Sequence, residues 1–319
     1  MFRTLGVDHG TKSLRFCLLE NGKQDFFEIE RKEQKNVSPL KELKKKGFLD
    51  VDLVGLTYSM ADGISAITDI KKVHNRGQKE KITGAFVGVG TRLYDEIKES
   101  NIKAALIPGL HRDVPCLDES FKILFSHMAA SEKTALSYHA FKEVNKSKPI
   151  ENIVIVDISS NTVSIGIKNS RFYGAIDACL GSPGLLHGPL DLEAIRHIDN
   201  ENVSANKSFY SAGVTQKSSI SSDEILNGET KKDKEARNAL ITGVKMEVFG
   251  LSSLINPEII VLTGSAIDAN VFTEEIESEL SKISPIVKLG KFSAAVGTAE
   301  IAKDILEGKT DFLGITVDN

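Results

Sequence analysis

The chain has 319 residues, of which 41% are hydrophobic and 26% charged, so it can bury a core and its length predicts two domains or one large α/β domain. Its formal net charge of -4 gives no basis for binding a nucleic acid backbone, and we expect no nucleic-acid partner. No apolar run is long enough to span a membrane and no signal-peptide pattern is present, so we expect a cytoplasmic protein without a membrane partner.

The three cysteines, Cys17, Cys116 and Cys179, lie far apart in the sequence. An odd number without a Cys-x-x-Cys pair argues against a disulfide framework or a zinc cluster. We therefore expect three reduced thiols that serve packing.

The first sixty residues predict a strand meander followed by a helix and a further strand. Apolar runs alternate with turns through residues 4–30, and Asn-Gly at 21–22 is a hairpin-turn signal, which predicts three antiparallel strands. A short helix is predicted over 38–47, with Ser38 as N-cap, Pro39 in the first turn and Gly47 at its end. Residues 53–59 predict another strand.

The middle of the chain predicts helices around one strand. Residues 92–100 form an amphipathic pattern, and 103–110 read as a strand that Pro and Gly end. Through 118–143, apolar residues recur at intervals of three and four, which predicts sustained helix. The polar stretch 145–149 interrupts that pattern and marks the expected domain boundary.

The second half predicts a second strand cluster followed by helices. Strands are expected at 152–158, 162–168 and 171–177, then a Pro/Gly-rich loop, and then a mobile polar surface excursion over 199–223. The remaining pattern predicts a long helix over 231–255 and then a strand that follows Pro257. Two more helices are predicted, over 272–282 and 294–308.

The two strand clusters repeat one pattern. Asp8 and Asp157 each follow an apolar run, and each precedes a turn of small polar residues. Backbone N–H groups and hydroxyls of such a turn can wrap an anion, while the carboxylate can hold Mg2+ beside it. The alternative is two ordinary hairpins in which each Asp bonds its own turn. The repetition favours the functional interpretation and predicts two like domains that face each other across a cleft.

Five segments, in order, resemble the motifs of the actin-like ATPase and sugar kinase superfamily. "LGVDHGTKSLRF" at 5–16 and "IVIVDISSNTVSIGI" at 153–167 are similar to its two phosphate hairpins. "ASEKTALSYHAF" at 130–141 and "AAVGTAEIAKDILEG" at 294–308 resemble its connecting helices, and "PEIIVLTGSA" at 257–266 resembles its adenosine motif. The resemblance implies an α/β fold of two ribonuclease-H-like domains with a nucleotide cleft, over 1–144 with the terminal helix 297–319, and over 145–296.

Finer features resemble one branch of this superfamily. "GSPGLLHGPLD" at 181–191 and the closing helix are similar to acetate and butyrate kinases, and the whole chain resembles the methanogenesis marker protein 12 family. The second phosphate turn departs from the superfamily because Ser159, Ser160 and Asn161 replace its glycines. Glycine allows close backbone approach to phosphate, so this departure predicts slow phosphoryl transfer.

The resemblance implies Mg-ATP as ligand and assigns the site residues. Asp8 and Asp157 are the expected metal-binding and catalytic carboxylates. The expected nucleotide contacts are Gly10, Thr11, Ser13, Ser159, Ser160, Thr162, Gly264 and Ser265. Positioning and charge stabilisation would supply most of any catalysis.

Three further polar residues have alternative interpretations. Arg112 could clamp a substrate anion or form a surface salt bridge. His187 could touch a substrate or be a solvated loop residue. Asp191 could position metal or substrate, or cap the helix that follows it.

Three functions remain open from the sequence. The first is an accessory ATPase in methanogen metabolism, with slow or partner-dependent turnover and a protein partner. The second is a small-carboxylate kinase, and the third is a degenerate nucleotide-binding protein without turnover. The loop 181–191 has no Arg or Lys to hold a carboxylate, which favours the accessory role. The oligomeric state is left open.

Overall fold

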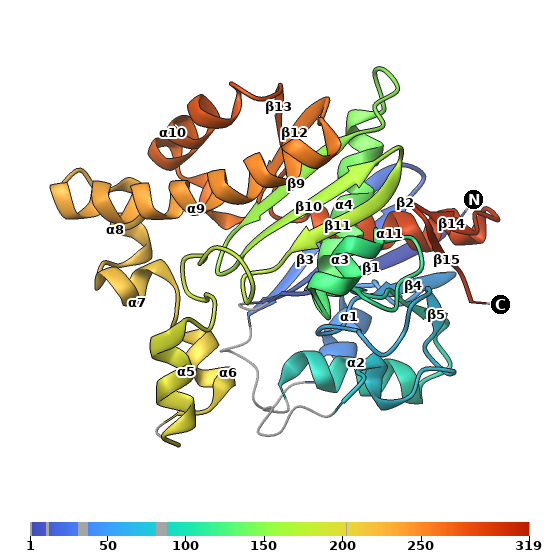
Figure 1. Cartoon of the computed structure of the whole chain (residues 1–319). Coiled ribbons are helices and arrows are strands. Elements are labelled where there is room, and N and C mark those ends of the chain that lie inside the picture. Colours follow the sequence, from blue (N-terminus) through green and yellow to red (C-terminus); the bar gives the residue numbers. More distant parts are fainter. Residues whose placement is uncertain (1, 11–12, 31–37, 81–87, 202, 319) are drawn as a thin grey trace. The chain divides into compact units, whose positions relative to one another are not determined.

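A computed structural model describes residues 2–10, 13–30, 38–80, 88–201 and 203–318 (Figure 1). The chain divides into two compact units. The first contains Met1–Lys146 and Phe292–Asn319, and the second contains Ser147–Lys291. The sequence placed these boundaries at 144 and 297.

A mixed sheet forms the centre of the first unit. Its strand order is β3-β2-β1-β4-β6-β5. The first three strands form the predicted antiparallel meander, β4 and β6 continue parallel to β1, and β5 lies antiparallel at the edge. The strands are β1 (Arg3–His9), β2 (Ser13–Glu20), β3 (Lys23–Glu30), β4 (Leu53–Leu56), β5 (Thr68–Asp69) and β6 (Ala104–Leu106).

Helices and two small hairpins complete this unit. The predicted cap of the first helix is confirmed, since the Ser38 side chain accepts a hydrogen bond from the Lys41 backbone N–H. The helices are α1 (Pro39–Lys45), the short 3-10 helix η2 (Asn75–Gly77), α2 (Val89–Glu99), α3 (Glu119–Leu124), α4 (Ser131–Val144) and α11 (Ser293–Leu306). The hairpins are β7 (Leu110–His111) with β8 (His127–Ala129), and β14 (Asp311–Phe312) with β15 (Ile315–Thr316).

Helix α11 packs directly against the backbone of the sheet and of α4. A Cβ at Gly6 of β1 would lie 2.0 Å from the Ala295 carbonyl oxygen, and one at Gly55 of β4 would lie 2.3 Å from that of Thr298. A Cβ at Gly297 would lie 1.9 Å from the Ala135 carbonyl oxygen of α4. These three glycines are needed because any side chain would push the elements apart.

The sustained helix predicted over 118–143 is wrong. Helix α3 ends at Leu124, and the chain then forms β8, which pairs with β7, before α4 begins at Ser131. Leu124 and Phe125 supplied part of the apolar periodicity, yet Leu124 is 66% exposed and Phe125 is only half-buried. Their spacing therefore fits a helix without their side chains joining the core.

The second unit repeats the sheet topology of the first. Its strand order is β11-β10-β9-β12-β13, with an antiparallel meander of three strands and two strands parallel to β9. The strands are β9 (Ile153–Ile158), β10 (Thr162–Lys168), β11 (Arg171–Ile176), β12 (Ile259–Thr263) and β13 (Ile286–Lys288). Every residue of β9 and β12 is buried, as in strands covered on both faces.

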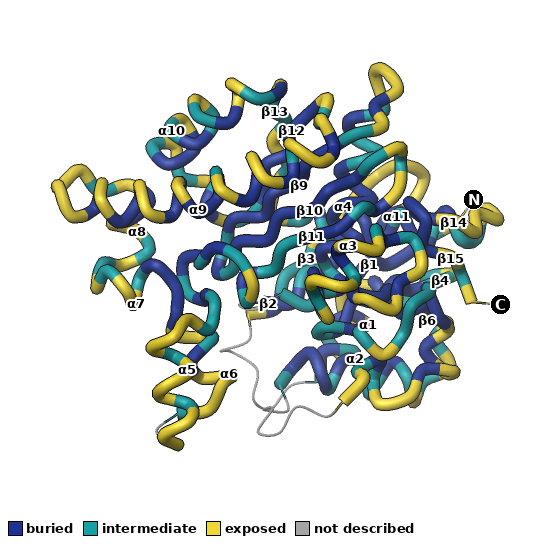
Figure 2. Tube along the Cα trace, in the orientation of Figure 1, coloured by how far each residue is buried: buried dark blue, intermediate teal, exposed yellow. Residues whose placement is uncertain are grey.

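The polar excursion predicted over 199–223 is instead largely helical. Ser204 and Ser221 are N-caps, so serines that suggested a loop begin helices. The helices are α5 (Leu192–Asp199), α6 (Ala205–Tyr210), α7 (Val214–Ser218), α8 (Ser222–Asn227), α9 (Lys231–Ile255), the 3-10 helix η3 (Ser265–Asp268) and α10 (Asn270–Leu280). Figure 2 shows α5 and α6 largely exposed or half-buried.

The long helix predicted over 231–255 is confirmed as α9. Thr230 and Asp233 form a capping box at its start, and Arg237 on its next turn is only 1% exposed. The Arg237 guanidinium donates to the carbonyl oxygens of Ile225 and Gly228, at 3.1 Å and 2.9 Å. The arginine thereby joins α9 to the end of α8.

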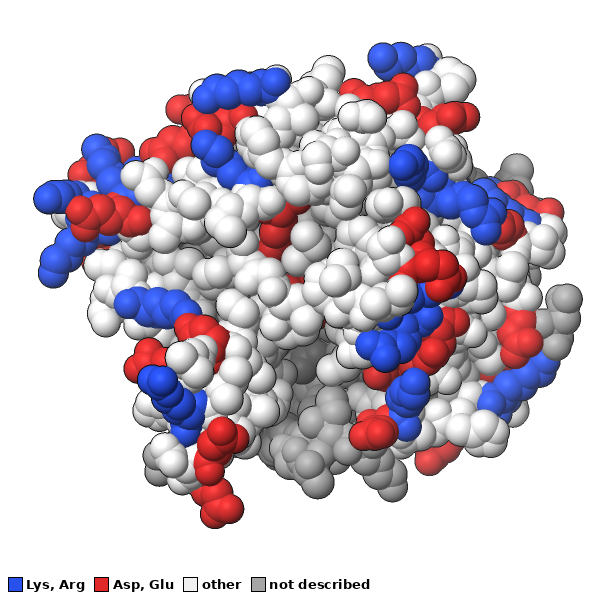
Figure 3. Space-filling model, in the orientation of Figure 1, with Lys and Arg blue, Asp and Glu red and all other residues white. Residues whose placement is uncertain are grey.

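The described helices include none long and apolar enough to cross a bilayer. On the face drawn in Figure 3, Lys and Arg side chains lie beside Asp and Glu rather than in one basic area.

Candidate functional site

Asp8 and Asp157 occupy the same topological position in their respective units. Each is the penultimate residue of a strand, β1 or β9, that has an antiparallel neighbour on one side and a parallel neighbour on the other. Both residues are buried, at 3% and 8% exposure. The carboxyl ends of parallel strands are where α/β sheets bind ligands.

In the first turn, the Asp8 carboxylate and the Ser13 hydroxyl already interact with other protein groups. Arg15 Nη1 lies 3.4 Å from Asp8 Oδ2 and its Nε lies 3.2 Å from Glu28. The Ser13 hydroxyl is buried and donates to Glu28 at 2.5 Å, so it is engaged within the hairpin. Gly10 is half-buried. Thr11 lies outside the described residues.

In the second turn, hydroxyl groups are also engaged. Ser159 donates to Asp157 Oδ1 at 2.9 Å, and the fully buried Thr162 donates to the Pro183 carbonyl oxygen at 3.2 Å. Ser160 is buried, and its carbonyl oxygen accepts from the backbone N–H groups of Leu186 and His187. Within the described residues, no acceptor binds the backbone N–H groups of Ser160 and Asn161. An anion bound at this turn would therefore contact backbone N–H groups rather than side-chain hydroxyls.

The loop 181–188 packs on this second turn, and this corrects the interpretation of His187 as a solvated loop residue. His187 is only 4% exposed, and its Nδ1 is hydrogen-bonded to the Asn161 side-chain oxygen. Burial lowers the pKa of His187 to about 4, so the ring is neutral at pH 7. A Cβ at Gly184 would lie 2.5 Å from the Asn161 Cα, so glycine is required for this contact. His187 thus positions the turn.

Glu247 of α9 anchors the other end of the loop, and the sequence did not single it out. It is 4% exposed, and it accepts hydrogen bonds at 2.6 Å from both the Ser164 hydroxyl and the Ser182 backbone N–H. Burial raises the pKa of Glu247 to about 7. A carboxylate 65 residues from its loop partner gives no local sequence signal, so only the fold could identify it.

Gly264 and Ser265 follow β12. Gly264 has φ of 101°, and a Cβ there would lie 2.3 Å from the Ile158 carbonyl oxygen. Both facts require glycine for the packing of β12 on β9, independently of any ligand. Ser265 is exposed at the start of η3.

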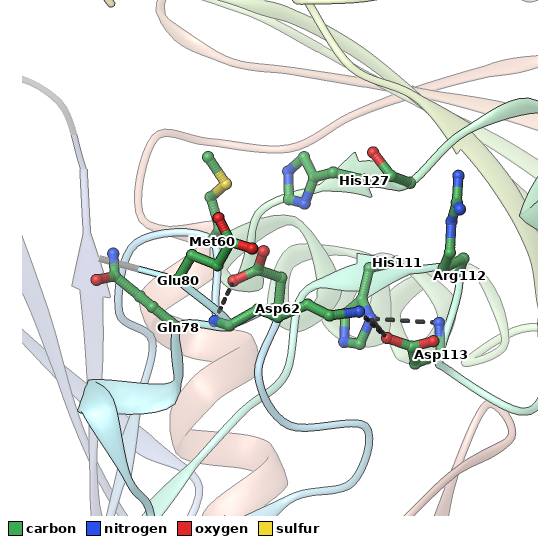
Figure 4. Close-up of a pocket in the computed structure, with 10 residues that line it drawn as sticks. Met60, Asp62, Gln78, Glu80, His111, Arg112, Asp113 and His127 are labelled. Atoms are coloured by element: carbon green, nitrogen blue, oxygen red, sulfur yellow. Dashed lines mark hydrogen bonds and ion pairs between the residues drawn. The ribbon is translucent and has the colours of Figure 1, made fainter. Parts of the chain in front are cut away.

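Arg112 lies in a pocket of the first unit with a volume of about 280 Å³ (Figure 4). Its guanidinium forms no hydrogen bond or ion pair with any other described residue, so the predicted surface salt bridge is not formed within the described chain. The lining residues are Met60, Asp62, Gln78, Lys79, Glu80, His111, Arg112, Asp113, Ser126 and His127. The carboxylates outnumber the Lys and Arg side chains by three to two.

The polar groups of this pocket are partly satisfied by one another. Lys79 pairs with Asp113 at 2.9 Å, which lowers the pKa of that carboxyl. His111 is bonded through Nε2 to the Ile64 carbonyl oxygen at 2.8 Å, and burial lowers the pKa of His111. A neutral His111 and an excess of carboxylates leave Arg112 as a weak anion clamp.

Asp191 is a helix cap. Its side chain accepts from the Ala194 backbone N–H at 3.1 Å and pairs with Lys217 at 2.5 Å. The Lys217 hydrogen bond lowers the pKa of Asp191. The sequence left two interpretations of Asp191 open, and the structure shows that it is the N-cap of α5.

The donors at the two turns fit Mg2+. Carboxylate oxygens are its preferred protein ligands, and Mg2+ keeps several waters, so one carboxylate per turn is sufficient. The Asp8 carboxylate also pairs with Arg15 at 3.4 Å, so a bound ion would share this carboxylate with the guanidinium.

Solved structures share the fold of the chain. An acetate kinase from Entamoeba histolytica matches with a TM-score of 0.62 and 12% identity, over 95% of this chain and 99% of that one. A propionate kinase from Francisella tularensis matches with a TM-score of 0.62 and 13% identity, over 95% and 100%. A ROK family glucokinase from Streptomyces griseus matches with a TM-score of 0.54 and 13% identity, over 95% and 99%. The predicted α/β actin-like ATPase fold is therefore confirmed.

Relatives in sequence come from methanogens. A UPF0285 protein of Methanococcus maripaludis strain C5 is 44% identical over 98% of this chain and 99% of its own. A UPF0285 protein of Methanocaldococcus jannaschii is 42% identical over 99% of both, and one of Methanosarcina mazei is 38% identical over 98% of both. No family model matches the chain. Because these similarities extend over nearly the full length of each sequence, the chain belongs to the UPF0285 protein family.

Proposed function

We propose that this protein binds Mg-ATP through the turns that follow β1 and β9 and hydrolyses it slowly or only with a protein partner. The observation that carries the proposal is the equivalent placement of Asp8 and Asp157, two buried carboxylates at the carboxyl ends of topologically matched strands. Both carboxylates also have protein partners, Arg15 for Asp8 and Ser159 for Asp157, so a bound cation would share each carboxylate with that contact. The proposal therefore rests on the matched position of the two residues, at the strand ends where α/β sheets bind ligands.

Each predicted residue has a defined role in this proposal. Asp8 and Asp157 hold Mg2+ or its waters, and the ion neutralises phosphate charge. Gly10 and Thr11 contact phosphate from the first unit, and we assign a positioning role to the Ser13 hydroxyl, which is bonded to Glu28. Ser159, Ser160 and Thr162 form the second turn, where we assign phosphate contact to the backbone N–H groups and a positioning role to the Thr162 hydroxyl. Gly264 and Ser265 flank the adenosine.

The second turn supports slow turnover. Its carbonyl groups and the Asn161 side chain are bonded to the loop 181–188, so the turn is held by the protein in one conformation. Serine and asparagine side chains also prevent the close backbone approach that glycines allow. We therefore propose nucleotide binding as the main activity, with an accessory role in methanogen metabolism, which the methanogen origin of the relatives supports.

The pocket around Arg112 disfavours the carboxylate kinase alternative. A short carboxylate needs a surplus of fixed cations, whereas carboxylates are in excess here and Lys79 is paired with Asp113. His187, the other predicted substrate residue, is buried against Asn161 and neutral at pH 7. We propose that His187 orders the second turn.

The test measures thermal unfolding with and without Mg-ATP. At a nucleotide concentration of about 100 times Kd, binding stabilises the native state by about 2.7 kcal/mol, which gives a clear rise in Tm. Asp8→Asn and Asp157→Asn should each lose most of that rise. Asp50→Asn is the matched control, because the Asp50 side chain is 99% exposed and pairs only with Arg3 among the described residues.

Two assays then separate the functions. Phosphate release should be slow, and hydroxylamine trapping with ATP and short carboxylates should give no hydroxamate. Robust hydroxamate that Arg112→Ala abolishes would establish the kinase instead. Absence of any Tm rise with millimolar ATP, ADP or GTP would contradict nucleotide binding altogether.

A further inference from the structure

A cluster of metal-ligating side chains lies between α4 and α11, apart from both candidate turns. His139 and Glu143 are one helical turn apart on α4, and Glu300 projects from α11. One ligand atom from each residue lies within 4.8 Å of the other two. The His139 and Glu300 side chains are only 10% and 12% exposed, and Glu143 is 27% exposed.

The helix contact that places these residues is fixed by backbone packing. Gly297 lies against the Ala135 carbonyl oxygen, where no Cβ fits. His139 follows Ala135 by one turn, and Glu300 follows Gly297 by about one turn, so the close contact brings these two side chains together. His139 Nδ1 and Glu300 Oε2 are 3.0 Å apart. Two rigid helices therefore present all three donors.

The charges in the cluster suit a divalent cation. Glu143 and Glu300 bring two carboxylates close together beside one imidazole. Lys146 pairs with Glu143 at 2.6 Å, while the neighbouring Lys142 is engaged by Asp304 at 2.9 Å. A carboxylate as buried as Glu300 is stabilised when a cation shares it.

The donor set indicates which cation fits. One imidazole nitrogen with two carboxylate oxygens is a ligand set for Zn2+ and similar divalent ions, whereas Mg2+ and Ca2+ prefer oxygen ligands alone. Among the described residues, the buried Cys17 is not part of the group whose ligand atoms meet in this cluster. Three protein donors leave one tetrahedral position for water.

We propose that His139, Glu143 and Glu300 bind one Zn2+-class ion that ties α4 to α11. The ion would replace the hydrogen bond between His139 and Glu300 with two coordination bonds and would bring in Glu143. Since α4 is the last element of the first unit before residue 147, and α11 is the first after residue 291, the ion would fasten the chain where it leaves and re-enters that unit. This proposal does not depend on nucleotide binding.

The experiment titrates tag-free, chelator-treated full-length protein with Zn2+ and with Co2+. We expect one ion per chain, visible Co2+ ligand-field bands without a thiolate charge-transfer band, and a Tm rise of about 5 °C with Zn2+ at 100 times Kd. Millimolar Mg2+ should not compete.

Variants separate a built site from adventitious binding. His139→Gln and Glu300→Gln should weaken Co2+ binding by about 10-fold to 100-fold or more. Glu143→Gln changes the most exposed donor, so it tests the site even if the other two variants fail to fold. Glu307→Gln is the matched control on α11, since Glu307 pairs only with Lys303 among the described residues and should bind Co2+ as the unmodified protein does. Equal Co2+ binding by Glu143→Gln and Glu307→Gln, or no ligand-field bands in the unmodified protein, would overturn the proposal.

Discussion

The Glu247 carboxylate accepts a hydrogen bond from the Ser182 backbone N–H at 2.6 Å, and this bond anchors the loop that packs on the turn after β9. The same carboxylate accepts from the buried Ser164 hydroxyl of β10. Helix α9, strand β10 and the loop are thus joined through one buried acid. Because burial raises the pKa of Glu247 from 4.5 to about 7, this connection responds to pH.

The first prediction concerns the pH dependence of stability. A carboxyl whose pKa is higher in the folded state binds protons more strongly in that state than in the unfolded state. Its contribution to the free energy of unfolding is therefore full below pH 4.5 and is lost as pH rises to about 7. Glu247→Gln keeps both hydrogen bonds, since the Ser164 hydroxyl can rotate to accept from the amide. The variant should therefore gain stability relative to the unmodified protein through this pH range, by up to about 3 kcal/mol.

Urea unfolding at pH 4.5, 6, 7 and 8 measures this difference. Glu235→Gln is the control, because Glu235 lies on the same helix but is 64% exposed. Its free energy of unfolding should differ from that of the unmodified protein by the same amount at every pH. Parallel pH curves for Glu247→Gln and the unmodified protein would show that Glu247 titrates normally.

A second prediction separates packing from ligand contact at Gly264. Gly264→Ala places a Cβ 2.3 Å from the Ile158 carbonyl oxygen at a φ of 101°, and the dihedral alone costs about 1–3 kcal/mol. We expect the free energy of unfolding to fall by at least this amount without nucleotide present. Gly250→Ala, on α9 with no atom within 4 Å of its added Cβ, should instead gain about 0.5–1 kcal/mol. Unchanged stability of Gly264→Ala would mean that the glycine is not required for packing.

A third prediction concerns the buried Arg237. Arg237→Met removes the donors to the Ile225 and Gly228 carbonyl oxygens and the 3.0 Å contact with Glu275. Leaving buried acceptors without donors costs about 1–3 kcal/mol, so chemical denaturation should show a loss of this size. Lys234→Met, a change on the same helix in a surface pair with Glu229, should change stability by less than about 0.5 kcal/mol. Similar losses of stability in both variants would mean that the buried hydrogen bonds of Arg237 stabilise the protein no more than the surface pair of Lys234 does.

Local signals in the sequence predicted most of the fold. Helix α9 was predicted over its full length, and the first helix was predicted with its Ser38 cap, because periodicity and capping depend on residues three or four positions apart. The strand meanders were predicted for the same reason, since turn residues separate their apolar runs. The ordered resemblance of five segments, the two Asp-containing meanders among them, then indicated the fold.

The errors arose where distant residues decide the structure. Pairing of β8 with β7 interrupts the segment predicted as helix, although Leu124 and Phe125 fit a helical spacing. The solvated-loop alternative for His187 was wrong, because its burial depends on contacts such as that with Asn161, 26 residues away. Glu247 gave no signal for the same reason. The arrangement of the candidate site therefore depends on long-range contacts that local patterns do not encode.

The discontinuity of the first unit has a consequence for how the chain acquires its structure during synthesis. Residues 147–291 form one continuous stretch, so this unit can complete its core while translation is still under way. The sheet of the first unit must wait, because α11, which covers Gly6 and Gly55, is made only after the whole second unit. Until then β1 and β4 lack the helix that covers them, so a released chain that ends at residue 291 should be cleaved by protease in its first 146 residues and resist cleavage in 147–291.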